Sequence, residues 1–470
     1  MRTSFLGQHA PNRYSVALKG FEARPRDKEV CPANGSQHDF IYAALRSVYS
    51  KAQAGSAPKK LHRPSVTFLV YHYLRERAHE VLNSYVKLEH RRFNVAFPKG
   101  ELAETPPVSA GLSLIDKHGI VPEGAMPEAY EARITRGKRN DLQAQLDATM
   151  AEFVKAIEHV HDHKKPDSAA AKTQRTEIVA RYKKRVDALL DKTLGKPPKA
   201  FRIGETRYTP KSYAQEVLGQ PSKPERVVLT NDPNRPMYRR FKRDGVVHYN
   251  VPLALIRRAV VASLKVGEAV PMTTDLSARN AYQLVSGEAP QQAVGVLSLA
   301  AFDYSPLVGE SNTDKAQMRR ANTAAADHTL AITGYDAKGG KVVKWRVEGA
   351  LTEKMGDKGV LHMYDDYLGR YIDSAVVSRD VVSSKLLQRI DKTKLLPWEP
   401  SLKERYSGQR GLQNLVFDVA SGKVSERQAA RHSELSVQQI KSLRKTALNA
   451  MWRALDDSDH VRPADKVPQR

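Results

Sequence analysis

The order of the sequence patterns predicts an α+β protein in which a helical half precedes a half rich in strands. Up to about residue 200, apolar residues recur at the spacing of one helix face. After residue 207, apolar positions alternate with a period of two, and β-branched residues become frequent. A run of helices followed by a run of strands is typical of α+β folds, whereas alternating βαβ units would mix the two.

The helical half consists of amphipathic segments separated by polar turns. Helices are expected at residues 40–49, 66–88, 112–117, 139–161 and 174–194. The last two are long and charged, and the hinge between them, 163–168, contains Pro166. They are therefore predicted to form a helical hairpin.

The second half shows the alternation of half-buried strands. Strands are expected at residues 227–230, 246–251, 269–273, 329–335, 342–347 and 360–363, with a helix at 253–264. Gly339 and Gly340 mark a tight turn between two of these strands. Residues 1–30 are polar and basic without clear period, which predicts an N-terminal arm.

Composition limits the class of protein. The 470 residues include 76 Lys and Arg against 52 Asp and Glu, a net charge of +24 that favours polyanionic partners. A single cysteine, Cys31, excludes an internal disulfide framework and cysteine-ligated zinc fingers. No apolar run approaches the ~18 residues of a membrane span, and the first twenty residues lack a signal-peptide core. We expect a cytoplasmic protein without a membrane partner.

Six short motifs occur in one order along the chain. The longest stretch, residues 327–371, reads DHTLAITGYDAKGGKVVKWRVEGALTEKMGDKGVLHMYDDYLGRY. The others are KHGIVP (117–122), TPKSYAQEVLG (209–219), VLTNDP (228–233), KVGEAV (265–270) and LPWEP (396–400). Together they resemble the bleomycin hydrolase and aminopeptidase C branch of the papain-like cysteine peptidases. The resemblance implies a papain-like domain over 31–400 with a helical insertion at about 139–194, followed by a helical C-terminal module, 401–470.

The resemblance also assigns the catalytic positions. A cysteine peptidase needs a thiolate, a histidine, a group that orients the imidazole, and an oxyanion donor. The family histidine matches His328, whereas the orienting asparagine position holds Gly349. The family reads S-G-R-C-W-I-F-A-A-L at the nucleophile, and aligning residues 41–45 without a gap puts Asp39 at the cysteine and Ala33 at the oxyanion glutamine. This implies a pseudopeptidase in which Asp39 and His328 form a salt bridge.

The alternative is an active cysteine aminopeptidase with a displaced nucleophile. Cys31 is the one available thiol, and it lies eight residues before Asp39 beside Pro32. Upstream of the helix it would lose the helix dipole that stabilises a thiolate.

A dense basic cluster, RPMYRRFKR, occupies residues 235–243. Its candidate nucleic-acid ligands are Arg235, Tyr238, Arg239, Arg240, Phe241, Lys242 and Arg243. Cations that bind phosphates, interleaved with aromatic rings that stack, suit contact with single-stranded or nonspecific nucleic acid. The alternative is a solvated connection between two strands.

The C-terminal module has a second candidate interface. Ser425 with Gln428, and Ser436 with Gln439, have the spacing of capping boxes, so two helices are expected to begin there. The region resembles a response-regulator helix-turn-helix, although Glu434 stands where the turn usually has glycine. The groove-facing residues would be Gln438, Gln439, Lys441, Ser442, Arg444 and Lys445. The alternative is a helical hairpin that packs within an oligomer.

No metal or cofactor is predicted. His159 and His163 lie four residues apart on a helix, but no nearby Glu or Cys completes a ligand set.

The resemblance further implies a homo-oligomer, since bleomycin hydrolase-like proteins form hexameric barrels with a basic channel. The leading hypothesis is a catalytically inactive bleomycin hydrolase-like protein that acts as an oligomeric scaffold for DNA or RNA. The other hypotheses are the active aminopeptidase and a structural or protein-interaction protein.

Overall fold

The computed structural model describes residues 14–18, 36–55, 61–87, 108–127, 139–163, 168–243, 246–276, 295–299, 314–320, 328–349, 359–397, 415, 419, 425–426, 429 and 436–456. The chain divides into two compact units. The first comprises Met1–Arg240 with Asp244–Lys394, and the second comprises Phe241–Arg243 with Leu395–Arg470.

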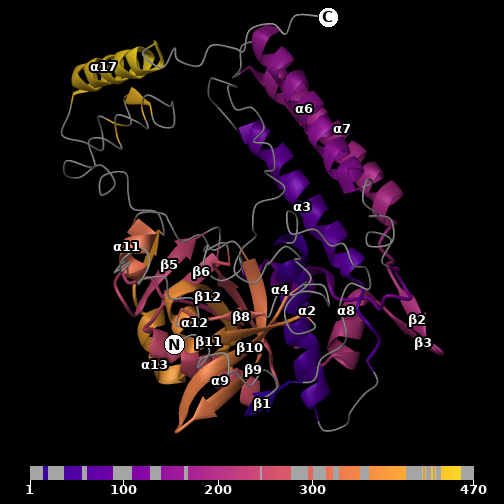
Figure 1. Ribbon diagram of the computed structural model, residues 1–470. Coiled ribbons are helices and arrows are strands. Elements are labelled where there is room, and N and C mark those ends of the chain that lie inside the picture. Colours follow the sequence, from indigo (N-terminus) through magenta and orange to yellow (C-terminus); the bar gives the residue numbers. More distant parts are fainter. Residues whose placement is uncertain are drawn as a thin grey trace, which may run out of the picture. The chain divides into compact units, whose positions relative to one another are not determined.

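The first unit begins with the expected helices (Figure 1). They are α2 (Ser36–Ala54), α3 (Val66–Lys87), α4 (Ala110–His118), α6 (Arg139–His163) and α7 (Ala169–Leu194). All five predicted helices are confirmed. Helix α7 packs against both α3 and α6, so the predicted hairpin is anchored to the rest of the helical part.

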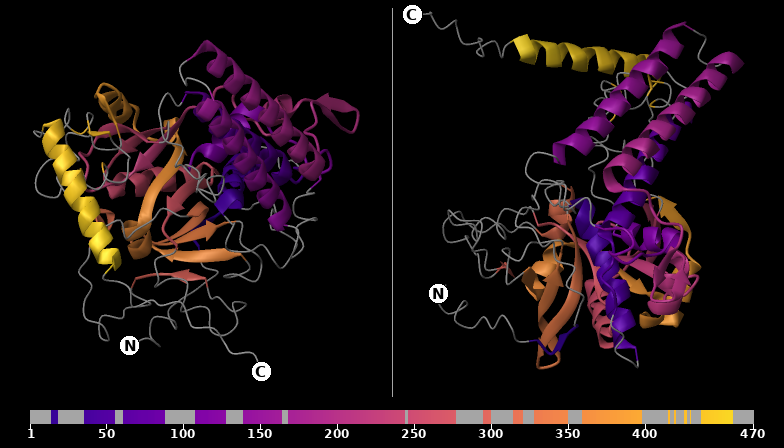
Figure 2. Two further views of the ribbon diagram at one scale, coloured as in Figure 1. Left: turned by 90° about the horizontal axis from the view of Figure 1, so that it is seen from above. Right: turned by 90° about the vertical axis from the view of Figure 1, so that its right-hand side faces the viewer.

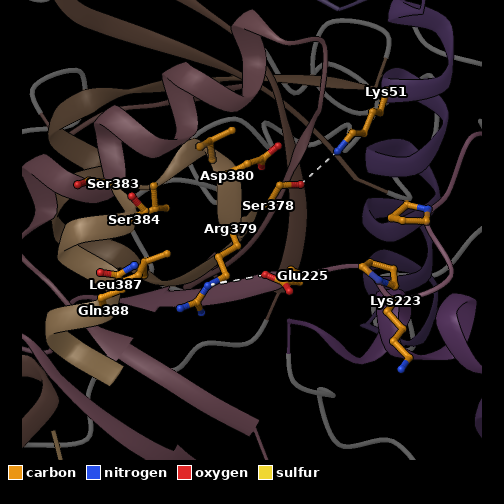
Figure 3. A pocket seen from close by; sticks show the side chains of 14 residues that line it. Lys51, Lys223, Glu225, Ser378, Arg379, Asp380, Ser383, Ser384, Leu387 and Gln388 are labelled. Carbon is orange, nitrogen blue, oxygen red and sulfur yellow. Dashed lines mark hydrogen bonds and ion pairs between the residues drawn. The ribbon is translucent and has the colours of Figure 1, made fainter. Parts of the chain in front are cut away.

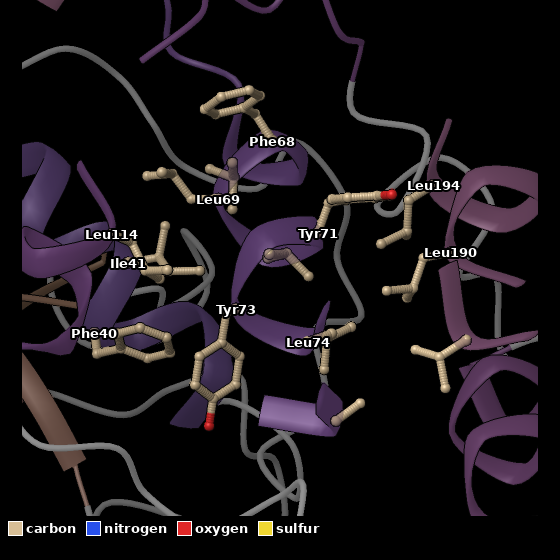
Figure 4. Packing of buried hydrophobic residues seen from close by; sticks show 14 of the residues in the cluster. Phe40, Ile41, Phe68, Leu69, Tyr71, Tyr73, Leu74, Leu114, Leu190 and Leu194 are labelled. Atoms are coloured by element: carbon tan, nitrogen blue, oxygen red, sulfur yellow. The ribbon is translucent and has the colours of Figure 1, made fainter. Parts of the chain in front are cut away.

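The core of the helical part is a continuous apolar cluster centred on α3. Figure 4 shows Leu69 and Leu74 of α3 lying between Ile41 of α2 and Leu190 of α7. Helix α4 approaches α2 closely because Gly111 has no side chain: a Cβ there would lie 2.5 Å from the carbonyl oxygen of Phe40. Close packing on both sides therefore holds the first turns of α2 in one orientation.

A large twisted sheet forms the other part of the first unit (Figure 1). Its strands are β4 (Arg226–Thr230), β6 (Val246–Asn250), β7 (Val270–Thr274), β8 (Val296–Leu297), β9 (His328–Lys338), β10 (Lys341–Glu348), β11 (Val360–Tyr364) and β12 (Ile372–Ser378). They run in the order β6-β4-β12-β7-β9-β10-β11-β8. The six predicted strands and the Gly339–Gly340 turn are confirmed, and the expected α+β class holds.

Different helices cover the two faces of the sheet. Helices α9 (Leu253–Lys265) and α12 (Asp365–Tyr371) share an apolar cluster with Trp345 and Val347 of β10. Helix α2 contacts β9 and β7, and its polar side chains meet Glu348 of β10. Because successive residues of a strand point to opposite faces, α2 covers the face opposite to Trp345.

Shorter elements complete the first unit. They are a separate hairpin of β2 (Phe201–Ile203) and β3 (Thr206–Tyr208), and the helical turns α8 (Pro210–Ser212), η3 (Tyr213–Val217), α11 (Lys315–Arg320), η6 (Arg379–Val381) and α13 (Ser384–Asp391). In Figures 1 and 2 the hairpin projects outward beyond the helices.

Part of the predicted N-terminal arm lies on the sheet. Strand β1 (Val16–Ala17) pairs with β9, and the Leu18 amide donates to the Thr333 carbonyl at 2.8 Å. Gly334 permits this approach, since a Cβ there would lie 2.4 Å from the carbonyl oxygen of Val16.

The second unit contains α17 (Val437–Asp456), and its part of β5 (Arg239–Arg243) pairs with β13 (Leu395–Pro397). The Gln439 amide donates to Ser436 Oγ at 3.2 Å, and Gln439 Oε1 accepts from the Ser436 amide at 2.8 Å. The capping box predicted at Ser436 is therefore confirmed. Gln428, the partner expected for Ser425, lies outside the described residues.

Candidate active site

The predicted nucleophile position lies in the first turn of α2. Asp39 is 3% exposed, and the next residues, Phe40 and Ile41, are fully buried. The ring of Phe40 meets that of Tyr73 edge to face, with centroids 4.9 Å apart. A shift of one residue would rotate the helix by about 100° and expose this apolar face, so packing fixes the position of Asp39.

Anchors along α2 show which end of the sheet Asp39 occupies. Ser50 Oγ accepts from the Ala269 amide at 2.8 Å, just before β7 begins. Asp39 precedes Ser50 by eleven residues, roughly 16 Å along a helix axis, which is close to the roughly 17 Å spanned by five residues of a strand. At that distance along β7 lies Thr274, which pairs with His328. Asp39 and His328 therefore occupy the same end of the sheet.

The third predicted position lies at this end as well. Gly349 is buried and directly follows β10, whose last residue, Glu348, pairs with Ala331 of β9. The Tyr42 hydroxyl, one helical turn from Asp39, donates to Glu348 Oε2 at 2.9 Å. The structure thus brings Asp39, His328 and Gly349 to one region, whereas Ala33 and Cys31 lie outside the described residues.

A buried polar network holds this region together. Arg46 donates from Nε to Glu348 Oε2 at 2.8 Å, and Thr333 Oγ1 donates to Glu348 Oε1 at 3.0 Å. Arg346 also contacts Glu348 and donates to Thr333 Oγ1 at 2.8 Å. Burial lowers the pKa of Arg46, while its contact with the Tyr42 hydroxyl opposes that change. The charged groups of Arg46 and Glu348 are satisfied inside the protein, as buried charges must be.

Residues 344–348 of β10 read KWRVE, and alternate side chains of this motif point to opposite faces of the sheet. Trp345 and Val347 point to the apolar face, where Trp345 Nε1 donates to Asp365 Oδ1 at 3.1 Å. Arg346 and Glu348 point to α2. The motif therefore has a structural role: it couples the sheet to α2 on one side and to α12 on the other.

A second charged cluster, which the sequence did not reveal, lies at the same end of the sheet. Lys315 of α11 donates to the Ile372 carbonyl at 2.8 Å and to Asn231 Oδ1 at 3.2 Å. Ile372 belongs to β12 and pairs with Thr274 of β7, and β7 lies between β12 and β9 in the sheet. Lys315 therefore contacts β12, which is separated from β9 by one strand. Burial and, to a smaller extent, the nearby Arg319 lower the pKa of Lys315 to about 7. The VLTNDP motif, which supplies Asn231, was the available sequence signal.

The hollow shown in Figure 3 lies at the other end of α2. It has a volume of about 670 Å³, and its lining includes Lys51, Lys223, Glu225, Ser378 and Arg379. Lys51 Nζ lies 2.9 Å from Glu268 Oε2 and 3.3 Å from Ser378 Oγ. Since Lys51 is twelve residues after Asp39, this pocket is separate from the predicted catalytic positions.

Another hollow, also of about 670 Å³, follows α3 and the end of α4. His118 Nε2 lies 2.6 Å from Glu76 Oε1, and the ring of His118 stacks on that of His72 with centroids 3.7 Å apart. Burial lowers the pKa of His72 to about 3, and the neighbouring His118 contributes to this shift. His118 also has a lowered pKa, chiefly because of burial. These two rings therefore favour the neutral form.

The cluster at 235–243 does not form one exposed surface. Arg235 pairs with Asp232 at 3.2 Å, and Arg240 donates to the carbonyls of Asp391 and Thr393. Phe241 is only 3% exposed, so its ring has no face available for a base. The remaining members Tyr238, Arg239 and Lys242 are exposed, and Arg243 is half-buried. The segment expected as a nucleic-acid contact or a solvated connection contains strand β5.

Most predicted groove-facing residues of α17 are exposed. Gln438, Gln439, Lys441, Ser442 and Lys445 all lie at the surface, whereas Ile440 is buried. Arg444 is the exception, because it is half-buried and pairs with Glu426 at 3.0 Å.

The described residues contain neither a metal-binding cluster nor a membrane span. Within the described ranges, no group of three or more His, Cys, Asp or Glu side chains could hold a metal ion. The same part of the chain has no helix that is long and apolar enough to cross a membrane.

Several known proteins are similar to this chain in sequence or in fold. The model of the Peptidase C1-like family matches residues 108–401. Aminopeptidase C of Listeria monocytogenes is 24% identical over 328 residues, which cover 64% of this chain and 69% of that protein. Aminopeptidase W of Lactobacillus delbrueckii subsp. lactis is 26% identical over 309 residues, covering 61% and 66%. Human bleomycin hydrolase is 26% identical over 323 residues, covering 62% and 66%. The matched parts thus span about two thirds of these relatives.

A solved structure of PepW from Lactobacillus rhamnosis HN001 superposes with a TM-score of 0.65 at 21% identity. The superposition covers 85% of this chain and 90% of that one. This similarity confirms the fold that the motifs imply.

Proposed function

This chain belongs to the Peptidase C1-like family, and we propose that it is a member without peptidase activity, whose fold serves for binding. The observation that supports this most directly is Asp39. It occupies the first turn of α2, at the end of the sheet where His328 begins β9. The packing of α2 determines which residue lies at this position, and that residue is an aspartate instead of a cysteine.

The chemistry of these positions is unsuited to acyl transfer. A thiolate is the nucleophile of cysteine peptidases, and a carboxylate at the same place is a poor one. The helix N-terminus favours an anion, so Asp39 retains the negative charge of a thiolate without its reactivity. Gly349 has no side chain with which to orient an imidazole. In this proposal Asp39 and His328 form an ion pair that stabilises the former catalytic region.

The main alternative is an active aminopeptidase that uses Cys31. In the sequence Cys31 lies five residues before Ser36, where α2 begins, so the first turn of α2 holds Asp39 and not this thiol. A thiolate is stabilised most by the helix dipole in that first turn.

Activity measurements separate these functions. We expect the protein to turn over no aminoacyl fluorogenic substrate and to show no labelling by a thiol-directed epoxide, and the C31S variant should behave identically. Turnover that disappears in C31S would establish the alternative. As a positive control, D39C/G349N in the C31S background restores a thiol to the first turn of α2, so it should be labelled by the epoxide.

The binding part of the proposal concerns nucleic acid. The net charge of +24 and the exposed Lys441 and Lys445 of α17 support a polyanionic partner. By resemblance to bleomycin hydrolase-like proteins, we propose a homo-oligomer, with six copies as the expected number. Binding of a labelled duplex that weakens steeply with salt would support this part. Absent or salt-insensitive binding would favour a structural or protein-interaction role instead.

A further inference from the structure

A strongly basic, exposed segment of the first unit includes the β2–β3 hairpin. Residues 192–211 contain six cations and a single acid, Glu205, a net charge of +5 over twenty residues. The chain as a whole carries about one net positive charge per twenty residues. All six cations are exposed: Lys192, Lys196, Lys199, Arg202, Arg207 and Lys211. This segment is thus about five times as basic as the average.

Two of these cations stand directly opposite each other. Arg202 of β2 and Arg207 of β3 are cross-strand partners in the antiparallel pair. Directly opposed residues point to the same face, with Cβ atoms about 5 Å apart, and like charges in this arrangement destabilise a hairpin. Neither arginine forms an ion pair with another residue in the part of the chain that the structure describes. An external anion would relieve this repulsion.

The other face of the hairpin is anchored to the helical core. Phe201 lies 5.5 Å and Tyr208 lies 5.8 Å, between ring centroids, from Tyr213, which is fully buried. Gly204, with φ of 58°, permits the tight turn between the strands. A two-stranded hairpin is only marginally stable by itself, so these aromatic contacts hold the two arginines in place.

We propose that the hairpin face of Arg202 and Arg207, together with the flanking lysines, binds the phosphate backbone of a nucleic acid. The inference rests on the nucleic-acid part of the proposed function and gives it a location. Paired guanidinium groups suit phosphate oxygens, which they bind through two parallel hydrogen bonds. The aromatic rings of the hairpin face the core, so no ring on this surface stacks on bases. Binding here is therefore independent of nucleotide sequence.

The chain provides a matched control for this surface. Lys338 and Lys341 are also exposed cross-strand partners, and they flank the two-residue turn between β9 and β10. Their double replacement by glutamine removes the same charge from the same kind of pair. No comparable run of cations surrounds that turn, since Asp336 lies within two residues of Lys338.

The experiment measures binding of a fluorescein-labelled 20-base-pair duplex, of two unrelated sequences, across a salt series. R202Q/R207Q should weaken binding roughly tenfold or more near 0.15 M salt, and should reduce the slope of log K against log salt by about 1.8, since two phosphate contacts are lost. K338Q/K341Q should bind like the wild type. The melting temperature of R202Q/R207Q should not fall, because the substitutions remove a repulsion.

The possible results show separately whether the hairpin is the binding site and whether the protein binds nucleic acid. If the wild type binds and both double variants bind equally well, the hairpin assignment is overturned while the nucleic-acid function stands. If the wild type does not bind, the nucleic-acid function fails and the assignment fails with it. Displacement of the duplex by poly-glutamate at equal charge concentration would overturn the assignment in favour of an acidic protein partner.

Discussion

Arg46 of α2 and Glu348 of β10 form a buried two-point contact, with Nε 2.8 Å from Oε2 and Nη2 3.3 Å from Oε1. Their side chains are 1% and 9% exposed. The pair joins α2, whose first turn contains Asp39, to β10, which ends directly before Gly349. The placement of Asp39 relative to Gly349 therefore depends on this buried ion pair.

Replacement of Glu348 by glutamine should destabilise the protein by about 3–5 kcal/mol, because it leaves the guanidinium of Arg46 buried without a counter-charge. The free energy of unfolding in urea measures this loss. E80Q is the control: its carboxylate is 72% exposed and pairs with Arg77 at 3.4 Å, so its loss should cost less than about 1 kcal/mol. Equal effects of the two substitutions would contradict the role given to Glu348.

Much of the fold follows from local sequence pattern. The helix at 40–49 and the strands on either side of Gly339 were predicted because hydrophobic periodicity is set by neighbouring residues. The assignment of Asp39 and Gly349 to catalytic positions depends on motif alignment alone and stays a prediction. Each of these signals lies within a short stretch of chain.

Long-range polar contacts could not be predicted in this way. Tyr42 and Arg46 meet Glu348 across about 300 residues, and no local pattern marks a buried charge whose partner is so distant. The cluster at 235–243 shows the same limit. A run of cations and aromatic rings indicates a surface, but a strand alternates its side chains, and Phe241 is thereby buried while Lys242 is exposed.

The arm on the sheet depends on Gly334. In G334A the new methyl group would lie about 2.4 Å from the Val16 carbonyl oxygen, so β1 should detach from β9. We expect the Leu18 amide, which donates to Thr333, to lose its protection from hydrogen exchange. G124A is the control, since no atom lies within 4 Å of the position its Cβ would take. Unchanged protection at Leu18 in G334A would refute this account of the arm.

The stacked histidines should make stability depend on pH. Because the pKa of His72 is lowered to about 3 in the folded protein, the unfolded chain binds a proton that the folded protein does not between about pH 6.5 and 3. Stability is therefore lost as pH falls through this window, by up to about 1.4 kcal/mol per pH unit. H72F should flatten this dependence in urea unfolding at pH 6.5, 5.5 and 4.5.

The surroundings of His72 define the control for this prediction. Besides His118, the charged groups that act on its pKa are Glu76, Arg75 and Lys117, and H72F leaves all of them in place. H159Q changes an exposed histidine of α6 and should keep the wild-type slope. If H72F and H159Q retain equal slopes, His72 does not carry the effect.

Lys315 should make the stability of the protein depend on pH above pH 7. Its pKa is lowered to about 7 in the folded protein, mainly by burial, whereas an unfolded lysine holds its proton to about pH 10.4. The unfolded chain therefore binds more protons between these values, so stability rises with pH above 7 and is lost as pH falls toward 7. K315M should remove this rise, which amounts to at most about 2 kcal/mol between pH 7.5 and 9. Unfolding free energies at both pH values measure it, and K341M, at an exposed position of β10, should leave the rise intact. A K315M variant that retains the full rise would show that Lys315 stays protonated among Asn231, Ile372 and the charged groups around them.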